Sequence, residues 1–208
     1  MRVLLADDHP IVRQGVRGLL EEAGHKVVGE AADGHEAVRL ARTLNPDVVV
    51  LDLSMPLLNG LDAARELRRL LPEIKTILLT MYSDKAYVLQ AMKAGAKGYV
   101  LKTQATEDLI RAIRGISRGE VYLSPSIAAS VVDAYLDNTD ATFDPLTARE
   151  RQIVQLIAEG KTTREVAGLL NISVKTAQSH RSHIMQKLEV HEVAGLVRYA
   201  INRGLLHP

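Results

Sequence analysis

Residues 48–52 read Val-Val-Val-Leu-Asp, an uninterrupted apolar run that ends in a carboxylate. Aliphatic side chains without polar alternation predict a strand that is buried on both faces, as in a parallel sheet. Similar short runs occur before and after it, at Val3–Ala6, Val27–Ala31, Thr76–Leu79 and Gly98–Leu101. The chain therefore contains five candidate strands of one buried sheet.

Helical periodicity fills the gaps between these strands. Apolar residues recur there at spacings of three and four, which is typical of one face of a helix. The expected helices are Ile11–Glu22, His35–Leu44, Leu61–Leu71, Lys85–Ala94 and Glu107–Ser117. Five alternating strands and helices predict an α/β fold with a five-stranded, doubly wound parallel sheet and helices on both faces.

The pattern changes after Gly119. Residues 127–136 have helical spacing, and the polar, turn-prone stretch 137–142 is a candidate linker. From Pro145 onward the sequence predicts helices only. We therefore expect a first domain at 1–118, a linker with a helical segment at 119–142, and a second domain at 143–208.

The second domain begins with two helix-start signals. Thr147-Ala-Arg-Glu150 and Thr162-Thr-Arg-Glu165 both fit the capping box, and Gly160 follows the first helix. A short helix, a three-residue turn and a longer helix then form the helix-turn-helix pattern. The expected later helices are Arg164–Leu170, Val174–Leu188 and Glu192–Asn202. This predicts an all-α domain of four helices.

The composition excludes several classes of protein. Of 208 residues, 47% are hydrophobic and 25% are charged, which is typical of globular domains and not of disordered chains. The absence of Cys excludes disulfides, thiolate metal sites and Cys nucleophiles. The apolar run at the N-terminus is too short for a signal peptide or a membrane span, so we expect a cytoplasmic protein without a membrane partner.

The net charge of +1 is unevenly distributed. Residues 141–208 carry nine Lys and Arg against six Asp and Glu, whereas residues 1–140 carry 17 against 19. This small basic excess indicates an anionic partner for the second domain, although a solvated surface accounts for the charge alone more simply.

Charged and polar residues follow four of the five strands. They are Asp7 and Asp8, Asp52, Thr80 and Lys102. Because ligands of open parallel sheets bind beyond the carboxyl ends of the strands, we expect these side chains to share one rim. Carboxylates this close favour Mg²⁺, and one of them is a candidate nucleophile toward a phosphoryl group.

Each of these residues alone also fits a purely structural role. Asp7 and Asp8 are typical of a helix N-cap followed by Pro at the first helical position, and Lys102 is typical of a solvated surface. Their convergence on one rim favours the magnesium and phosphoryl site.

The segments around this rim resemble the receiver domain of two-component response regulators over about residues 1–118. They read Leu-Ala-Asp7-Asp8-His-Pro, Val-Val-Leu-Asp52-Leu-Ser-Met-Pro-Leu-Leu-Asn-Gly60, Leu-Leu-Thr80-Met and Gly-Tyr99-Val-Leu-Lys102. The resemblance implies a flavodoxin-like fold and makes Asp52 the phosphoacceptor. It also implies that Asp8, Asp52 and the backbone carbonyl of Ser54 bind Mg²⁺, with Asp7 acting through water.

By the same resemblance, Thr80 and Tyr99 form a switch pair. Thr80 moves toward the phosphoryl group, and the Tyr99 ring follows inward. Lys102 stabilises the phosphoryl oxygens. The alternative for Tyr99, from the sequence alone, is a half-buried aromatic residue of a strand.

The helix Val174–Leu188 separates apolar from polar residues. Ala177 and Ile184 fall on the side opposite Ser179 and Gln186, and cations lie at the edges. A polar face of this kind suits the DNA major groove, although an ordinary amphipathic helix has the same periodicity. The candidates for DNA contact are Lys175, Thr176, Gln178, Ser179, Arg181, Ser182, His183, Gln186 and Lys187.

The second domain resembles the LuxR-type helix-turn-helix over about residues 143–206. The matching stretches are Leu146-Thr-Ala-Arg-Glu-Arg-Gln-Ile-Val-Gln-Leu-Ile-Ala-Glu-Gly-Lys and Val166-Ala-Gly-Leu-Leu-Asn-Ile-Ser-Val-Lys-Thr-Ala-Gln-Ser-His180-Arg. Joined to a receiver, this domain is identified as that of the NarL/FixJ class. The resemblance makes Val174–Leu188 the recognition helix and Glu192–Asn202 the helix that pairs two copies on DNA, with Val193, Val197 and Ala200 as dimerisation candidates.

Together these features predict a transcription regulator that is not an enzyme beyond phosphorylating and dephosphorylating itself. The expected partners are a sensor histidine kinase, double-stranded DNA with two half-sites, a second copy once phosphorylated, and RNA polymerase. Thr176-Ala-Gln-Ser-His180 departs from the family's usual Thr-Val-Glu-Thr-His, so no operator preference is transferred.

The sequence does not decide which face of the receiver forms a dimer. The two candidates are the helix Lys85–Ala94 and the surface formed by Ile11–Glu22 with Glu107–Ser117. We further expect the unphosphorylated receiver to cover the recognition helix. Two other functions fit the sequence. One is a DNA-binding regulator that works without phosphate, and the other, ranked below it, is a magnesium-dependent phosphatase.

Overall fold

The computed structural model describes residues 1–136 and 145–206, and the chain divides into two compact units, Met1–Thr142 and Phe143–Pro208. The predicted linker at 137–142 lies outside the described residues. None of the helices within the described ranges combines the length and the apolar character needed to cross a lipid bilayer.

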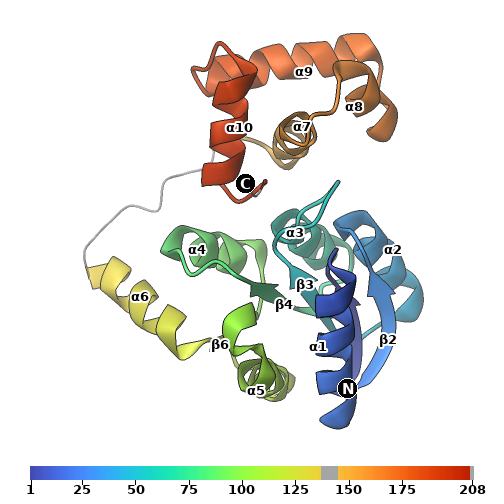
Figure 1. Ribbon diagram of the computed structural model, residues 1–208, viewed down its shortest axis with the longest axis vertical. Coiled ribbons are helices and arrows are strands. Elements are labelled where there is room, and N and C mark those ends of the chain that lie inside the picture. Colours follow the sequence, from blue (N-terminus) through green and yellow to red (C-terminus); the bar gives the residue numbers. More distant parts are fainter. Residues whose placement is uncertain (137–144, 207–208) are drawn as a thin grey trace. The chain divides into compact units, whose positions relative to one another are not determined.

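The first unit is built on one parallel sheet, which Figure 1 shows among its helices. Its strand order is β2-β1-β3-β4-β5-β6. The strands are β1 (Arg2–Ala6), β2 (Lys26–Ala31), β3 (Val48–Asp52), β4 (Lys75–Thr80), β5 (Gly98–Leu101) and β6 (Tyr122–Leu123). Every pair of neighbouring strands runs parallel. The order reverses between β1 and β3, which is where a doubly wound sheet opens a crevice at its carboxyl edge.

Helices cover both faces of this sheet because strand side chains alternate between the faces. On one face, Val3 and Leu5 pack with residues of α1 (Pro10–Glu22) and α5 (Ala105–Ser117). On the other face, Leu4 and Ala6 belong to a core built with the remaining helices of the unit. These are α2 (Gly34–Leu44), α3 (Gly60–Leu70), α4 (Lys85–Ala94) and α6 (Pro125–Leu136).

The sheet is larger than the sequence predicted, with six strands instead of five. The Tyr122 N–H donates to Lys97 O at 2.9 Å and extends the sheet beyond β5, after which the Ser124 N–H donates to Tyr99 O at 3.1 Å. From α6, Ile127 is fully buried in the core shared by α2, α3 and α4. The compact unit therefore extends past the predicted boundary at residue 118. The sequence did not predict this extension, because a strand of two residues is too short to show a hydrophobic pattern.

The second unit consists of helices only. They are α7 (Ala148–Ala158), α8 (Thr163–Leu169), α9 (Val174–Lys187) and α10 (Val193–Asn202). Both predicted capping boxes are present, with Thr147 and Thr162 accepting from the backbone N–H of Glu150 and Glu165. In the turn between α8 and α9, Asn171 has a positive φ of 51° and Ser173 caps α9. The fold class predicted from the sequence is confirmed in both units.

Candidate metal centre and nucleic-acid interface

Three carboxylates meet at the carboxyl edge of the sheet. Asp7 and Asp8 directly follow β1, and Asp52 is the last residue of β3. One ligand atom from each of these residues and from His9 lies within 4.8 Å of the others. Asp7 and Asp52 are only 1% and 3% exposed, and the Asp8 side chain is 32% exposed. The predicted convergence of these carboxylates is confirmed.

Lys102 lies among these carboxylates. Its Nζ is 2.7 Å from Asp7 Oδ2 and 2.9 Å from Asp52 Oδ2. Burial raises the pKa of Asp52 to about 6, although the Lys102 ammonium and the Ser54 backbone N–H oppose that rise. Burial favours the neutral amine of Lys102, but Asp52 and Asp7 outweigh it and raise the pKa of Lys102. The site is therefore a buried ion-paired cluster with an excess of negative charge.

The loop after β3 packs tightly against Asp52. The Gly60 N–H donates to Leu53 O at 3.0 Å, and the Asn59 side chain caps α3 by accepting from the Asp62 N–H. A Cβ on Gly60 would collide with the backbone carbonyl of Asp52. Only glycine fits there, because the loop returns directly over the end of the strand.

Thr80 and Tyr99 are joined through the backbone of Tyr82. The Tyr82 N–H donates to Thr80 Oγ1 at 3.2 Å, and the Tyr99 hydroxyl donates to Tyr82 O at 2.8 Å. The Tyr82 hydroxyl is also hydrogen-bonded to the side chain of Ser54. Tyr99 is fully buried, not half-buried, and burial raises its pKa.

Tyr82 was not among the residues predicted from the sequence. It lies in the loop between β4 and α4 and connects to Thr80 and Tyr99 through its main chain. Main-chain contacts leave no signature in side-chain type, so the sequence carries no signal that would have identified this residue.

The residues of the cluster fit a divalent cation. Asp7 Oδ2 and Asp8 Oδ1 are buried oxygens that accept no well-formed hydrogen bond, although Lys102 and His9 lie beside them. Three carboxylates against one ammonium leave negative charge to be neutralised. An all-oxygen donor set of this kind suits Mg²⁺.

In the second unit, α9 presents a polar face to solvent. Ala177 and Ile184 are buried against the domain, and Arg181 is half-buried. The exposed residues of the predicted set are Lys175, Thr176, Gln178, Ser179, Ser182, His183, Gln186 and Lys187.

Several side chains of this face are already hydrogen-bonded within the domain. The Thr176 hydroxyl lies 2.8 Å from that of Ser173, and Ser182 Oγ donates to Gln178 O at 3.2 Å. Lys187 Nζ donates to the Glu150 carboxylate at 2.6 and 2.8 Å. The longest polar side chains that project from α9 without such a bond in the described structure are Lys175, Gln178, His183 and Gln186.

The proposed pairing surface on α10 is smaller than predicted. Val193 is exposed and Val197 is partly exposed. Ala200 is fully buried within its own domain. It therefore offers no surface to a second copy.

Comparison with known proteins gives matches to both units. Residues 3–114 match the model of the response regulator receiver domain, and residues 144–200 match that of the bacterial regulatory proteins of the luxR family. The chain is 40% identical over 215 residues to the oxygen regulatory protein NreC of Staphylococcus carnosus (strain TM300), with 99% of each chain covered.

Two solved structures are also similar over nearly the whole chain. One is RcsB from Salmonella enterica serovar Typhimurium bound to promoter P1flhDC in the presence of phosphomimetic BeF3- (TM-score 0.65, 32% identity), covering 96% of this chain and 97% of that chain. The other contains two RcsB dimers bound to two parallel DNAs (TM-score 0.61, 30% identity), covering 98% of each chain.

Proposed function

The chain belongs to the two-component response regulators that join a receiver domain to a LuxR-type DNA-binding domain, and on this premise we propose that phosphorylation of Asp52 controls its activity. It is a DNA-binding transcription regulator of the NarL/FixJ class and not a classical enzyme. The observation that carries the proposal is the buried cluster of Asp7, Asp8 and Asp52 with Lys102.

The proposed reaction transfers a phosphoryl group from a phosphohistidine of a partner histidine kinase. A carboxylate oxygen of Asp52 attacks the phosphorus, and the phosphorus–nitrogen bond breaks as the new oxygen–phosphorus bond forms. The leaving imidazole takes the electron pair of the broken bond. Lys102 Nζ, 2.9 Å from Asp52 Oδ2, pairs with the charge on the phosphoryl oxygens.

Asp8 and Asp52, the backbone carbonyl of Ser54 and, through water, Asp7 would hold Mg²⁺. When bound, this ion supplies further positive charge to the phosphoryl oxygens. The support is the oxygen-rich donor set together with the two buried carboxylate oxygens of Asp7 and Asp8.

We propose that Thr80 and Tyr99 carry the signal away from Asp52. Thr80 would turn toward the phosphoryl group and so change its bond with the Tyr82 N–H. Because Tyr82 O also accepts from Tyr99, that movement would alter the hold on the Tyr99 ring and on α4 beside it. A local change in charge would thus bias a two-state element.

The proposed output is a homodimer that binds an operator with two half-sites. The related RcsB structures with promoter DNA and with dimers on DNA support this expectation. The exposed face of α9 would enter the major groove, and Val193 and Val197 on α10 would contribute to pairing. A regulator of this kind acts where the chromosome lies, so we propose a cytoplasmic location and contact with RNA polymerase.

The test uses a small phosphodonor with Mg²⁺, followed by mass spectrometry and measurement of oligomeric state. Asp52→Asn should remove both the adduct and the dimer shift. Asp33→Asn is the matched control, because Asp33 caps α2 outside the cluster and Asn caps equally well.

Two results would contradict the proposal. No adduct on the wild type, under conditions that phosphorylate another receiver, would favour a regulator that works without phosphate. Sustained turnover of small phosphate esters would favour a phosphatase.

We also propose that the unphosphorylated receiver covers α9. A chain without residues 1–142 should then bind operator more tightly than the unphosphorylated full chain at equal salt. Equal or weaker binding would contradict this covering role.

A further inference from the structure

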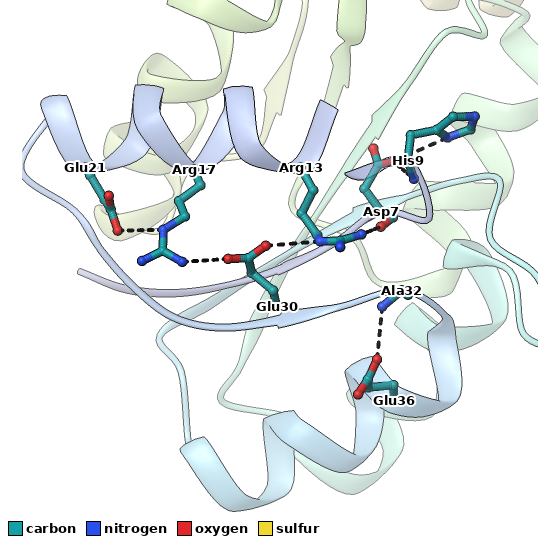
Figure 2. Close-up of polar contacts among 8 residues, drawn as sticks. All are labelled: Asp7, His9, Arg13, Arg17, Glu21, Glu30, Ala32 and Glu36. Atoms are coloured by element: carbon teal, nitrogen blue, oxygen red, sulfur yellow. Dashed lines mark hydrogen bonds and ion pairs between the residues drawn. The ribbon is translucent and has the colours of Figure 1, made fainter. Parts of the chain in front are cut away.

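The Asp7–Asp8 loop is held by a row of charged side chains outside the cluster itself. Figure 2 shows this row, which runs along α1 from Glu21 through Arg17, Glu30 and Arg13 to Asp7. Neither the sequence pattern nor the proposed reaction assigns a role to the four members of this row that precede Asp7.

Arg13 is the member of this row that touches the metal site. Its Nη1 donates to the backbone carbonyl of Asp7 at 2.6 Å, and its Nε donates to Glu30 Oε2 at 3.0 Å. The Arg13 side chain is only 19% exposed. A planar guanidinium holds two acceptors in one fixed geometry, so the Asp7 carbonyl is tied to β2 through Glu30.

The peptide group that Arg13 binds joins Asp7 to Asp8. On the other side of Asp7, its N–H donates to Ala31 O at 3.1 Å, so Asp7 is anchored in both directions. At the start of α1, the His9 N–H donates to Asp7 Oδ1 at 2.8 Å, and His9 Nδ1 lies 2.8 Å from Asp8 Oδ1, so the side chains of both aspartates also have a partner. The bond from Arg13 adds a hold on the main chain, because it fixes the carbonyl of the peptide through which Asp7 joins Asp8.

The charge of Arg13 is balanced within the row. Glu30 Oε1 accepts from Arg17 Nη1 at 2.7 Å, and Arg17 Nε donates to Glu21 Oε1 at 3.0 Å. Two guanidinium groups thus face two carboxylates. Arg13 can approach the metal site closely while its charge is offset by Glu30.

We propose that Arg13 is a positioning residue for the metal centre, which sets the affinity for Mg²⁺ by fixing the Asp7–Asp8 peptide. This inference rests on the proposed function of the same cluster. Supporting groups of this kind change metal affinity by about tenfold or more when they are removed.

The test compares Arg13→Met with Arg17→Met in the full chain. Both variants remove one cation and one bond to Glu30 from the same helix, but only Arg13 contacts Asp7. Mg²⁺ binding to the unphosphorylated protein is measured by titration calorimetry, and thermal stability is measured without metal.

The direction of the change in Mg²⁺ affinity distinguishes a positioning effect of Arg13 from an effect of its charge. Removal of a cation near three carboxylates would raise Mg²⁺ affinity if charge alone mattered. Positioning predicts that Arg13→Met weakens binding by about tenfold while Arg17→Met changes it by less than about twofold. At saturating Mg²⁺, the small phosphodonor should still modify Asp52 in the control variant Arg17→Met.

Arg13→Lys covers the case in which the Met variant fails to fold. Lysine keeps the charge but lacks the guanidinium fork, so binding should still weaken. Equal or tighter Mg²⁺ binding by Arg13→Met or Arg13→Lys would overturn the inference and leave the proposed function intact. A wild-type chain without Mg²⁺ affinity would overturn both.

Discussion

The ion pair between Glu150 and Lys187 offers the most direct test of what holds the second unit together. Glu150 lies in the first turn of α7 and is 7% exposed. Its carboxylate accepts from the Thr147 N–H at 2.8 Å and from Lys187 Nζ at 2.6 and 2.8 Å. It therefore connects the start of α7 to the end of α9.

Glu150→Gln removes the charge but keeps the capping box, because Gln also serves at this position. Burial of Glu150 alone would favour its neutral form, yet the bonds from Lys187 and Thr147 outweigh it and lower the pKa to about 2 from 4.5. Converted at about 1.4 kcal/mol per unit, this shift corresponds to roughly 3 kcal/mol at neutral pH. Lys187 is 43% exposed, so water screens the pair and we expect about 2 kcal/mol.

The sign of the pH dependence follows from the lowered pKa. The stabilisation is complete above pH 4.5 and is lost as the pH falls toward 2, because the carboxylate is then protonated in the folded chain as well. The difference between wild type and Glu150→Gln should therefore shrink over that interval.

Hydrogen exchange of the α9 amides in the full chain measures this difference locally. Glu165→Gln is the matched control, because Glu165 occupies the same capping-box position on α8 but is exposed. It should lower the stability much less. Equal losses in the two variants, or a difference that persists unchanged to pH 2, would refute the assignment of the stabilisation to this ion pair.

Four further predictions concern other parts of the chain. Lys175→Gln should reduce the dependence of operator affinity on the logarithm of salt concentration by about 0.9, whereas Lys187→Gln should leave that slope unchanged because Lys187 is bound within the domain. Gly15→Ala, in open space on α1, should raise the free energy of unfolding by about 0.5–1 kcal/mol in urea titrations. Gly60→Ala should lower it by about 2 kcal/mol, because its Cβ meets the backbone at the end of β3. Tyr99→Phe should cost about 1 kcal/mol in the same titration, since the Tyr82 carbonyl loses the hydroxyl that donates to it.

Most of the sheet could be predicted because its strands are buried on both faces. The apolar run at 48–51, which Asp52 was expected to follow, and the other four predicted strands are all found within about one residue of their expected ends. β6 could not be predicted, since it has two partly exposed residues and pairs only with the edge of β5.

The clustering of the acidic residues could be predicted because it depends on chain topology. Residues that follow parallel strands must meet at one edge, so Asp7, Asp52 and Lys102 were found from their positions alone. Arg13 and Glu30 could not be found in this way. They lie 17 residues apart, and their contact depends on how α1 packs beside β2.

The face of α9 was predicted from helical periodicity, which assigns exposure but not partners. Periodicity places Lys187 at the solvent surface, where it indeed lies. Its partner Glu150 is 37 residues earlier and belongs to another helix. The same limit explains Ala200, because helical spacing alone did not show that this residue of α10 is buried within its own domain.

The continuation of the receiver through β6 and α6 determines where its domain can be cut and joined to a domain of another protein. A fragment that ends near residue 118 would lack Ser124, whose N–H bonds Tyr99 O, and Ile127, which fills the core beside α4. Such a fragment would expose the edge of β5 and an apolar gap next to Tyr99. In a chimera that joins this receiver to a foreign DNA-binding domain, the junction should therefore lie after Leu136. The receiver then keeps β6 and α6.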